Sequence, residues 1–173
     1  MQLALGLLLL HLTLGLILFA HGAQKLFGLF GGQGLQGTVK FIEMLGLHPA
    51  KWWAIAAALG ETLGGLLMAL GLFTPLAALL ISAVMLVAFL RVHMQNGFWN
   101  SKGGYEYNLV LFVLAVALAI TGAGQFSLDA LIGLGPVTLA LFLLGALFLV
   151  ILGLLVWQPT VSWVQKHWHV FQS

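Results

Sequence analysis

Long apolar stretches alternate with short polar segments along the whole chain. Five of these stretches approach the length of about 20 residues that a helix needs to cross a hydrocarbon core of about 30 Å. They cover residues 3–20, 52–73, 74–92 and 105–121, with a fifth inside 130–157. Their apolar residues are continuous and do not alternate with polar ones, so the pattern predicts membrane-spanning helices and not the strands of a barrel.

Local signals refine these boundaries. The third stretch starts at Thr74-Pro75, where proline suits the first turn of a helix. Gly135-Pro136 marks a break or a late start of the fifth stretch. Two further segments, 38–45 and the tail after Trp157, are expected to be short helices that lie in the membrane interface.

The composition agrees with a membrane protein and excludes several other classes. Of 173 residues, 62% are hydrophobic and 6% are charged, with a mean hydropathy of +1.12. A soluble domain carries about 25% charged residues, so this chain could not cover a water-facing surface. The net charge of +2 does not suggest nucleic acid as a partner. The absence of cysteine excludes dithiol–disulfide chemistry and thiolate metal sites.

The charged residues divide the chain into two sides. With five spans, the six basic residues all fall on one side, namely Lys25, Lys40, Lys51, Arg91, Lys102 and Lys166. Basic loops favour the cytoplasm, so the N-terminus is expected outside and the C-terminus in the cytoplasm. All six tryptophans lie on the basic side as well, as in an aromatic belt.

Glu61 stands in the middle of the second apolar stretch, in LGETLGGLL. At 1.5 Å per residue it lies about 13 Å into the predicted span. A lipid-facing charge is costly there, so the carboxyl is expected to face other helices and either to stay protonated or to meet a cation. Gly60 and Gly64 form a GxxxG pattern that allows a close helix contact. A neutral, hydrogen-bonded structural glutamate is the alternative.

Candidate partners for Glu61 gather at the basic ends of three other spans. His21 and Lys25, in AHGAQKLFG, share one helical face if the first helix continues through them. The stretches RVHMQNGFW and GGYEYNL add Arg91, His93, Asn96, Tyr105, Glu106, Tyr107 and Asn108. Histidine and carboxylates can relay protons, so Glu61, His93 and Glu106 are the catalytic candidates. The ligand-binding candidates are His21, Lys25, Asn96 and Tyr105. The alternative is an ordinary membrane boundary, where such side chains reach toward water.

The remaining polar signals favour structural roles. His11 is expected to hydrogen-bond to a neighbouring helix, with Glu61 as one possible acceptor, and Asp129 to be the N-cap of the fifth span. The GxGxxG match at 32–37 lacks the strand and the acidic residue of a dinucleotide fold, so a flexible glycine-rich loop is expected. The six histidines contain no pair with the i,i+4 spacing of helical metal ligands, and no metal site is expected.

Five stretches in order resemble the DoxX family of small bacterial membrane proteins. They are HGAQKLFGLFGGQGLQGT (21–38), GETLGGLLMALGLFTPLAA (60–78), VHMQNGFW (92–99), GGYEYNL (103–109) and GAGQFSLD (122–129). The resemblance covers roughly residues 5–130. It implies that the family's characteristic polar positions are His21, Lys25, Glu61, His93, Tyr105 and Glu106. The chain departs from the pattern in having Gln2 where relatives often carry a basic residue, and in its fifth span.

The resemblance implies an all-α integral membrane protein with a four-helix transmembrane core. Residues 1–130 would form that core, and 131–173 would add a C-terminal transmembrane helix and an interfacial tail. The family's location implies a bacterial inner membrane.

The resemblance also implies distant kinship to the membrane subunit of thiosulfate:quinone oxidoreductase. The resulting hypothesis is a quinone-linked redox subunit or accessory. His93 or His21 would hydrogen-bond a quinone oxygen, and Glu61 would pass protons. A partner redox protein would supply electrons, because the chain has no evident cofactor motif of its own. Two other classes fit the same residues: a small proton-coupled transporter or channel, and an assembly factor without chemistry.

Overall fold

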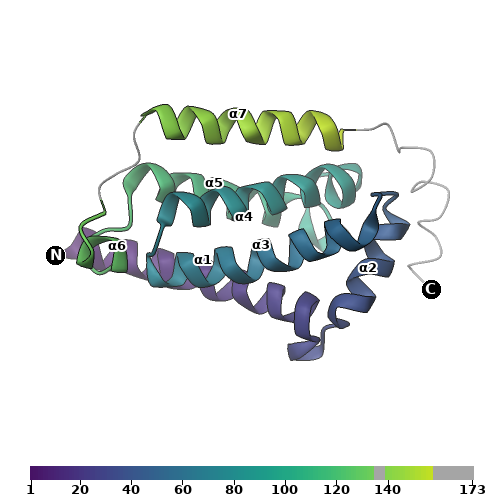
Figure 1. Cartoon of the computed structure of the whole chain (residues 1–173), viewed down its shortest axis with the longest axis horizontal. Coiled ribbons are helices and arrows are strands. Elements are labelled where there is room, and N and C mark those ends of the chain that lie inside the picture. The colour runs from purple at the N-terminus through teal and green to yellow at the C-terminus, as the bar shows by residue number, and fades with distance from the viewer. Residues whose placement is uncertain (135–138, 158–173) are drawn as a thin grey trace.

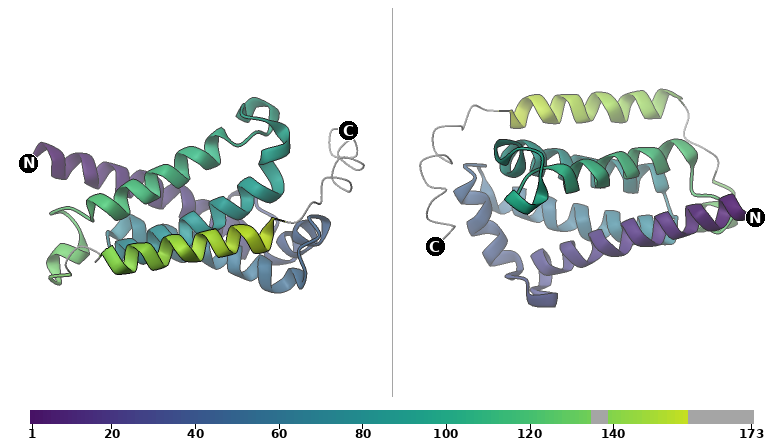
Figure 2. Two further views of the ribbon diagram at one scale, coloured as in Figure 1. Left: turned by 90° about the horizontal axis from the view of Figure 1, so that it is seen from above. Right: turned by 180° about the vertical axis from the view of Figure 1, so that it is seen from behind.

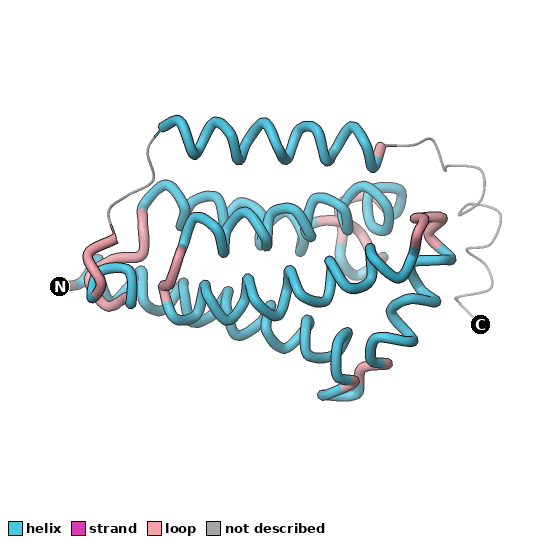
Figure 3. Tube along the Cα trace, viewed as in Figure 1, coloured by secondary structure: helices cyan, strands magenta, loops and turns pink. Residues whose placement is uncertain are grey.

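The protein is built from helices. The computed structural model describes residues 1–134 and 139–157, and no strand occurs within them (Figures 1 and 3). The long helices are α1 (Gln2–Phe27), α3 (Ala50–Leu70), α4 (Thr74–Ala88), α5 (Glu106–Thr121) and α7 (Leu139–Val156). The short ones are α2 (Gly34–Met44), α6 (Leu128–Leu131), the π-helical η2 (Phe89–His93), and the 3-10 turns η1 (Leu29–Gly31), η3 (Met94–Asn96) and η4 (Asn100–Lys102).

Three helical segments among the described residues are long and apolar enough to cross a membrane. They are Gln2–Phe27, Ala50–Leu70 and Thr74–Asn96, the last of which joins α4 to η2 and η3. Helix α5 and the Leu144–Val156 part of α7 are apolar but shorter, and α5 and α7 both run lengthwise beside the others (Figures 1 and 2). The prediction of an all-α membrane protein that crosses the bilayer several times is therefore confirmed.

Helices α1, α3, α4 and α5 form one bundle, and α7 lies along the outside of α4 (Figure 2). Their inward faces supply a common apolar core, with these fully or nearly fully buried members: Leu14, Leu18, Met68, Ala77, Ala78, Ile81, Met85, Leu111, Ala115 and Leu118. Many of the other large apolar side chains are exposed. Such an exposed apolar surface suits a bundle whose solvent is lipid.

Glycines bring α1 and α3 into direct backbone contact. A Cβ atom on Gly22 would overlap Thr62, one on Gly15 would overlap Ala69, and one on Gly65 would overlap the backbone of Phe19. The other two glycines of this region, Gly60 and Gly64, face α4 instead. The expected GxxxG pattern therefore serves the α3–α4 contact, and the neighbouring Gly65 serves the closer contact with α1.

The first helix extends beyond the predicted apolar stretch, to Phe27. It ends at Gly28, which adopts the left-handed conformation (φ 73°) that favours glycine. The prediction of a flexible glycine-rich loop at 32–37 is wrong in its second half, because α2 already begins at Gly34. Gly32 is also tightly packed, since a Cβ there would overlap Gln24.

Asp129 has a different role from the one predicted. Its carboxylate accepts hydrogen bonds from the backbone N–H groups of Phe73 (2.7 Å) and Thr74 (3.0 Å), so it caps the start of α4 from a distant part of the chain. The N-cap of α6 is Ser127, whose hydroxyl accepts from the Ala130 N–H at 3.1 Å. Sequence position alone could not distinguish these two caps, because the first depends on the α5–α6 loop folding back onto the α3–α4 turn.

The start of the last long helix is late, as Gly135-Pro136 suggested, because α7 begins at Leu139. Two glycines of α7 pack against α4. A Cβ atom added to Gly145 would lie 3.6 Å from the Leu79 side chain, and one added to Gly153 would lie 3.6 Å from the Leu86 side chain. The Gly135-Pro136 pair itself and the predicted interfacial tail after Trp157, with Lys166, lie outside the described residues.

Candidate functional site

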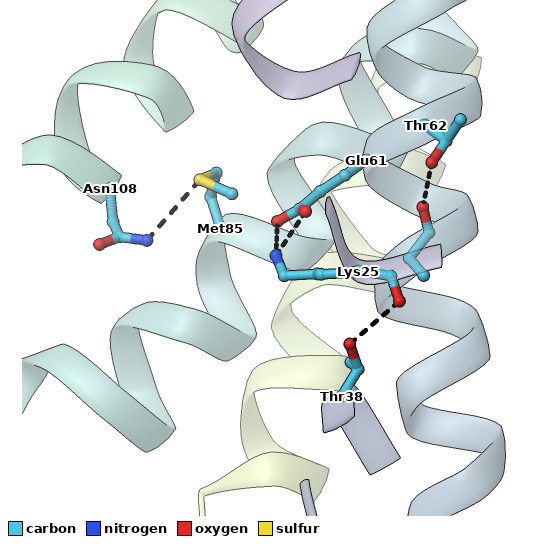
Figure 4. Close-up of polar contacts among 7 residues, drawn as sticks. Lys25, Thr38, Glu61, Thr62, Met85 and Asn108 are labelled. Atoms are coloured by element: carbon cyan, nitrogen blue, oxygen red, sulfur yellow. Dashed lines mark hydrogen bonds and ion pairs between the residues drawn. The ribbon is translucent and has the colours of Figure 1, made fainter. Parts of the chain in front are cut away.

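Glu61 meets its cation inside the bundle. The Lys25 ammonium group of α1 donates to both carboxylate oxygens of Glu61 on α3 (Figure 4). The Glu61 side chain is 3% exposed and that of Lys25 is 34% exposed. Of the two possibilities that the sequence left open, the structure shows the charged partner.

Close backbone packing places this ion pair. Gly22 of α1 lies against Thr62 of α3, which is the residue after Glu61. Lys25 lies one turn beyond Gly22 on α1, and its side chain reaches Glu61 beside Thr62 on α3. The Thr38 hydroxyl of α2 lies 3.1 Å from the Lys25 carbonyl oxygen and 2.9 Å from that of Gly34. The end of α1 and the start of α2 are thereby joined beside the pair.

The ion pair lies near the middle of α3. Glu61 is the twelfth of the 21 residues of that helix, which puts it about 16 Å from the helix start at 1.5 Å per residue. A charge pair at such a depth is costly unless its members are paired and face other helices. Both conditions hold here.

Side chains of α4 and α5 complete the surroundings of the pair. The His21 ring of α1 contacts the Tyr107 ring of α5 edge to face, with 6.3 Å between centroids. The Tyr107 phenol is close enough to Glu61 to interact electrostatically with its carboxylate. The buried Asn108 amide of α5 points toward the Met85 sulfur of α4 at 3.7 Å (Figure 4). Three other helices thus contribute polar or polarizable groups around the carboxylate of α3.

The other predicted site residues form a second polar group, in the segment that joins α4 to α5. The His93 Nδ1 lies 2.7 Å from the Gly103 carbonyl oxygen, and the Asn96 amide donates to the same oxygen at 3.1 Å. A carbonyl only accepts, so His93 carries its proton on Nδ1. Glu106 accepts from the Asn100 N–H at 2.9 Å. In the described part of the chain, these side chains form no hydrogen bond or ion pair with Lys25 or Glu61.

Tyr105 belongs to the second polar group through its ring. It packs edge to face against Phe89 (5.0 Å between centroids) and Phe98 (5.6 Å). The sequence grouped six of the seven candidates at one membrane boundary and placed Glu61 deeper, in the middle of the second span. The structure pairs Lys25 with Glu61, places His21 against Tyr107, and leaves the other four candidates in and beside the α4–α5 connection.

Tyr107 and Asn108 belong to the site more closely than Tyr105 does. The sequence placed them in the same polar cluster but did not choose them as catalytic or ligand-binding candidates. Helical spacing is the signal that could have found Asn108. It precedes the buried Leu111, Ala115 and Leu118 by three, seven and ten residues, so it lies on the same inward face of α5.

Arg91 is the other polar residue whose position the sequence did not predict. It is 6% exposed and donates to two backbone carbonyls, those of Leu45 after α2 and Val156 at the end of α7 (3.3 Å for the latter). Cations are favourable at helix C-termini, where carbonyl groups lack helical partners. Arg91 therefore joins three segments at the basic end of the bundle.

His11 makes the expected contact between helices, but not with Glu61. Its Nδ1 lies 2.9 Å from the Met68 carbonyl oxygen of α3, and the side chain is 2% exposed. Its role within the described residues is to hydrogen-bond α1 to the end of α3.

No group of three or more metal-ligating residues occurs among residues 1–134 and 139–157. One open, mostly apolar hollow of about 480 Å³ lies at the other end of the bundle, between the end of α3 and the 125–131 segment.

Comparison with known proteins identifies relatives of the chain. The DoxX family model matches residues 6–94. A Bacillus subtilis protein named "Putative oxidoreductase CatD" is 32% identical over 125 residues, which cover 72% of this chain and 85% of that protein. Two Haemophilus influenzae proteins, both named "Uncharacterized protein", are 34% identical over 104 residues and 30% identical over 130 residues. The first match covers 55% of this chain and 78% of the relative, and the second covers 73% and 83%. No solved structure matches the chain significantly.

Proposed function

Since the chain belongs to the DoxX family of membrane proteins, we propose that it is a quinone-linked subunit or accessory of a redox system in the bacterial inner membrane. The observation that supports this proposal is the Lys25–Glu61 ion pair, which is held at mid-helix depth beside an imidazole and a phenol. The oxidoreductase description in the name of the Bacillus subtilis relative agrees with it.

The residues around the pair fit a quinone head group. The group is flat and aromatic and has two carbonyl oxygens, and when bound it supplies a carrier for two electrons and two protons. The rings of His21 and Tyr107 offer aromatic surfaces. The Lys25 ammonium has three N–H donors and uses them within the described residues only on Glu61, so it can also donate to a carbonyl.

Each residue of the site then has a distinct task. Glu61 takes up protons and passes them on. Its carboxylate is buried, and the Lys25 ammonium group that is paired with it can move away when a proton arrives. Lys25 and His21 bind and orient the head group by hydrogen bonds. Electrons come from a partner redox protein. The assignments of His93, Asn96, Tyr105 and Glu106 to catalysis or ligand binding stay predictions, located in the α4–α5 connection.

The same proposal divides the chain into a four-helix core within residues 1–130 and an added part in 131–173. The added part includes α7, which lies on the outer side of α4. We assign it to contact with lipid or a partner protein rather than to the ligand site, because α7 packs mainly against α4 and η2, whereas Lys25 and Glu61 lie on α1 and α3.

Quinone content of the purified protein tests the proposal. Solvent extracts of wild type and of Glu61→Gln are compared by mass spectrometry, with Glu43→Gln as the matched control because Glu43 is exposed on α2. We expect near-stoichiometric quinone in wild type and in Glu43→Gln, and loss of most of it in Glu61→Gln.

The other outcomes identify the competing classes. Folded wild type without quinone contradicts the proposal. If Glu61→Gln then abolishes proton-coupled flux in liposomes, the protein is a transporter. If it lowers only the yield of folded protein, the ion pair serves assembly.

A further inference from the structure

The bundle of four helices is tightly packed on three sides and loosely packed on the fourth. Helix α1 packs along α3, α3 along α4, and α4 along α5, whereas α1 and α5 meet at few positions. At one of these positions the rings of His21 and Tyr107 are in contact. We call this side the α1–α5 seam, defined by His21 and Lys25 of α1 and by Tyr107 and Val110 of α5.

Exposure decreases in steps from the seam to the buried carboxylate. His21 is exposed at the surface, the Tyr107 residue is 38% exposed, the Lys25 side chain is 34% exposed, and that of Glu61 is 3% exposed. Glu61 is covered by the partly exposed Lys25 side chain and interacts electrostatically with Tyr107 of the seam, so we take the seam as the side from which the ion pair is reached.

The seam also presents polar groups that have no protein partner. In the described part of the chain, neither the His21 imidazole nor the Tyr107 hydroxyl makes a hydrogen bond. Val110, about one turn further along α5, is 62% exposed. Tyr107 is the second residue of α5 and His21 lies in the last third of α1, so the seam opens near the basic end of the bundle. A bound molecule that is itself dissolved in the bilayer could satisfy these groups.

We infer that the α1–α5 seam is the entrance through which a lipid-soluble quinone reaches the Lys25–Glu61 pair sideways from the bilayer. This inference rests on the proposed function and specifies the route to the same site. The flat head group enters where the rings of His21 and Tyr107 meet, and its carbonyl oxygens accept from Tyr107 and Lys25. The apolar tail stays in the lipid along Val110.

A fluorescent probe beside the seam tests this route. The chain has no cysteine, so Val110→Cys can be labelled with bimane at a single position in the full-length protein. Leu109→Cys is the matched control. Leu109 is also exposed (43%), but two residues correspond to about 200° around a helix, so it lies on the side of α5 away from Tyr107. Each variant is reconstituted into vesicles, and a membrane-dissolved quinone, itself a quencher, is added.

We expect the quinone to quench the probe at 110 at lower concentrations than the probe at 109, and Glu61→Gln to abolish this difference. Iodide, a quencher confined to water, should leave the probe at 110 bright while it quenches one at the exposed Lys40→Cys. Equal quenching at 109 and 110, or iodide quenching at 110 as strong as at 40, would overturn the lateral route.

The two failures can be told apart. If wild-type extracts contain quinone but the probes at 109 and 110 respond alike, the route is wrong and the proposed function stands. If wild-type extracts contain no quinone, both are wrong.

Discussion

At the scale of single residues, the Lys25–Glu61 pair determines what the buried carboxylate can do. Removing one partner of a buried pair leaves an uncompensated charge, whereas removing both often costs little. We expect Lys25→Met to lower the free energy of unfolding by about 3 kcal/mol, near the lower end of this effect because Lys25 is partly exposed. The double variant Lys25→Met/Glu61→Gln should recover most of that loss. Denaturant titration in detergent measures both.

Glu43→Gln on α2 is the control for this comparison, because Glu43 is exposed and a surface substitution should change stability by less than about 0.5 kcal/mol. A double variant as unstable as Lys25→Met would contradict the interpretation, since the loss would then come from the packing of the lysine stem and not from the unpaired charge.

Arg91 differs from Lys25 because its partners are backbone carbonyls, those of Leu45 and Val156. Hydrogen bonds from a charged group contribute about 1.5–3 kcal/mol each at most sites. We expect Arg91→Met, which removes both bonds, to lower the free energy of unfolding by about 3 kcal/mol, whereas the exposed Lys102→Met should leave it unchanged. Equal stability of the two variants in denaturant titrations would show that Arg91 is not needed to join α2 and α7.

At the scale of helices, the α1–α3 contact positions the ion pair. Gly22→Ala places a Cβ into Thr62, next to Glu61. Overpacking of this kind costs about 1–3 kcal/mol, and the helices must separate at the level of Lys25. We therefore expect both a lower unfolding free energy and a loss of bound quinone. The measurements are denaturant titration and quinone content on the same preparation.

Gly6→Ala is a close control because Gly6 lies in the same helix and an added Cβ there meets nothing within 4 Å. It should be neutral or slightly stabilising, since alanine favours helix more than glycine does. If Gly22→Ala behaved like Gly6→Ala, the backbone contact would not be what sets the position of the pair.

The helices themselves were largely predictable from the apolar pattern, whereas their ends and contacts were not. Hydropathy located α1, α3, α4 and α5, but it stopped the first span at residue 20 because His21 and Lys25 are polar. The helix continues to Phe27, because Lys25 forms an ion pair with Glu61 inside the bundle. Likewise, α2 begins within the glycine-rich stretch, where local composition favoured a loop but Thr38 bonds back to Lys25 and Gly34.

At the scale of the whole molecule, the sequence predicted a polar cluster but not its division into two groups. A count of polar residues at helix ends cannot tell Tyr105, which packs against Phe89 and Phe98, from Tyr107, which contacts His21. That distinction depends on the rotation of α5. Glu61 could be recognised from sequence because a mid-span carboxylate needs a partner wherever the helices pack.

The orientation of the whole molecule in the membrane now rests on fewer charges than the sequence suggested. Lys25 and Arg91 are engaged inside the fold, so their positions do not report on insertion. Lys40, Lys51 and Lys102 are exposed at the basic end, and exposed loop charges are the ones that set topology. Three such charges still favour a cytoplasmic basic end and an external N-terminus.

Single cysteines can test this orientation, because the chain has none of its own. We expect a membrane-impermeant thiol reagent, added to intact cells, to label Gln125→Cys, in the exposed loop after α5 at the end away from the lysines. It should not label Lys40→Cys or Lys102→Cys until the cells are opened. The reverse pattern would place the basic end outside. The partner that supplies electrons would then have to be sought on the other side of the membrane.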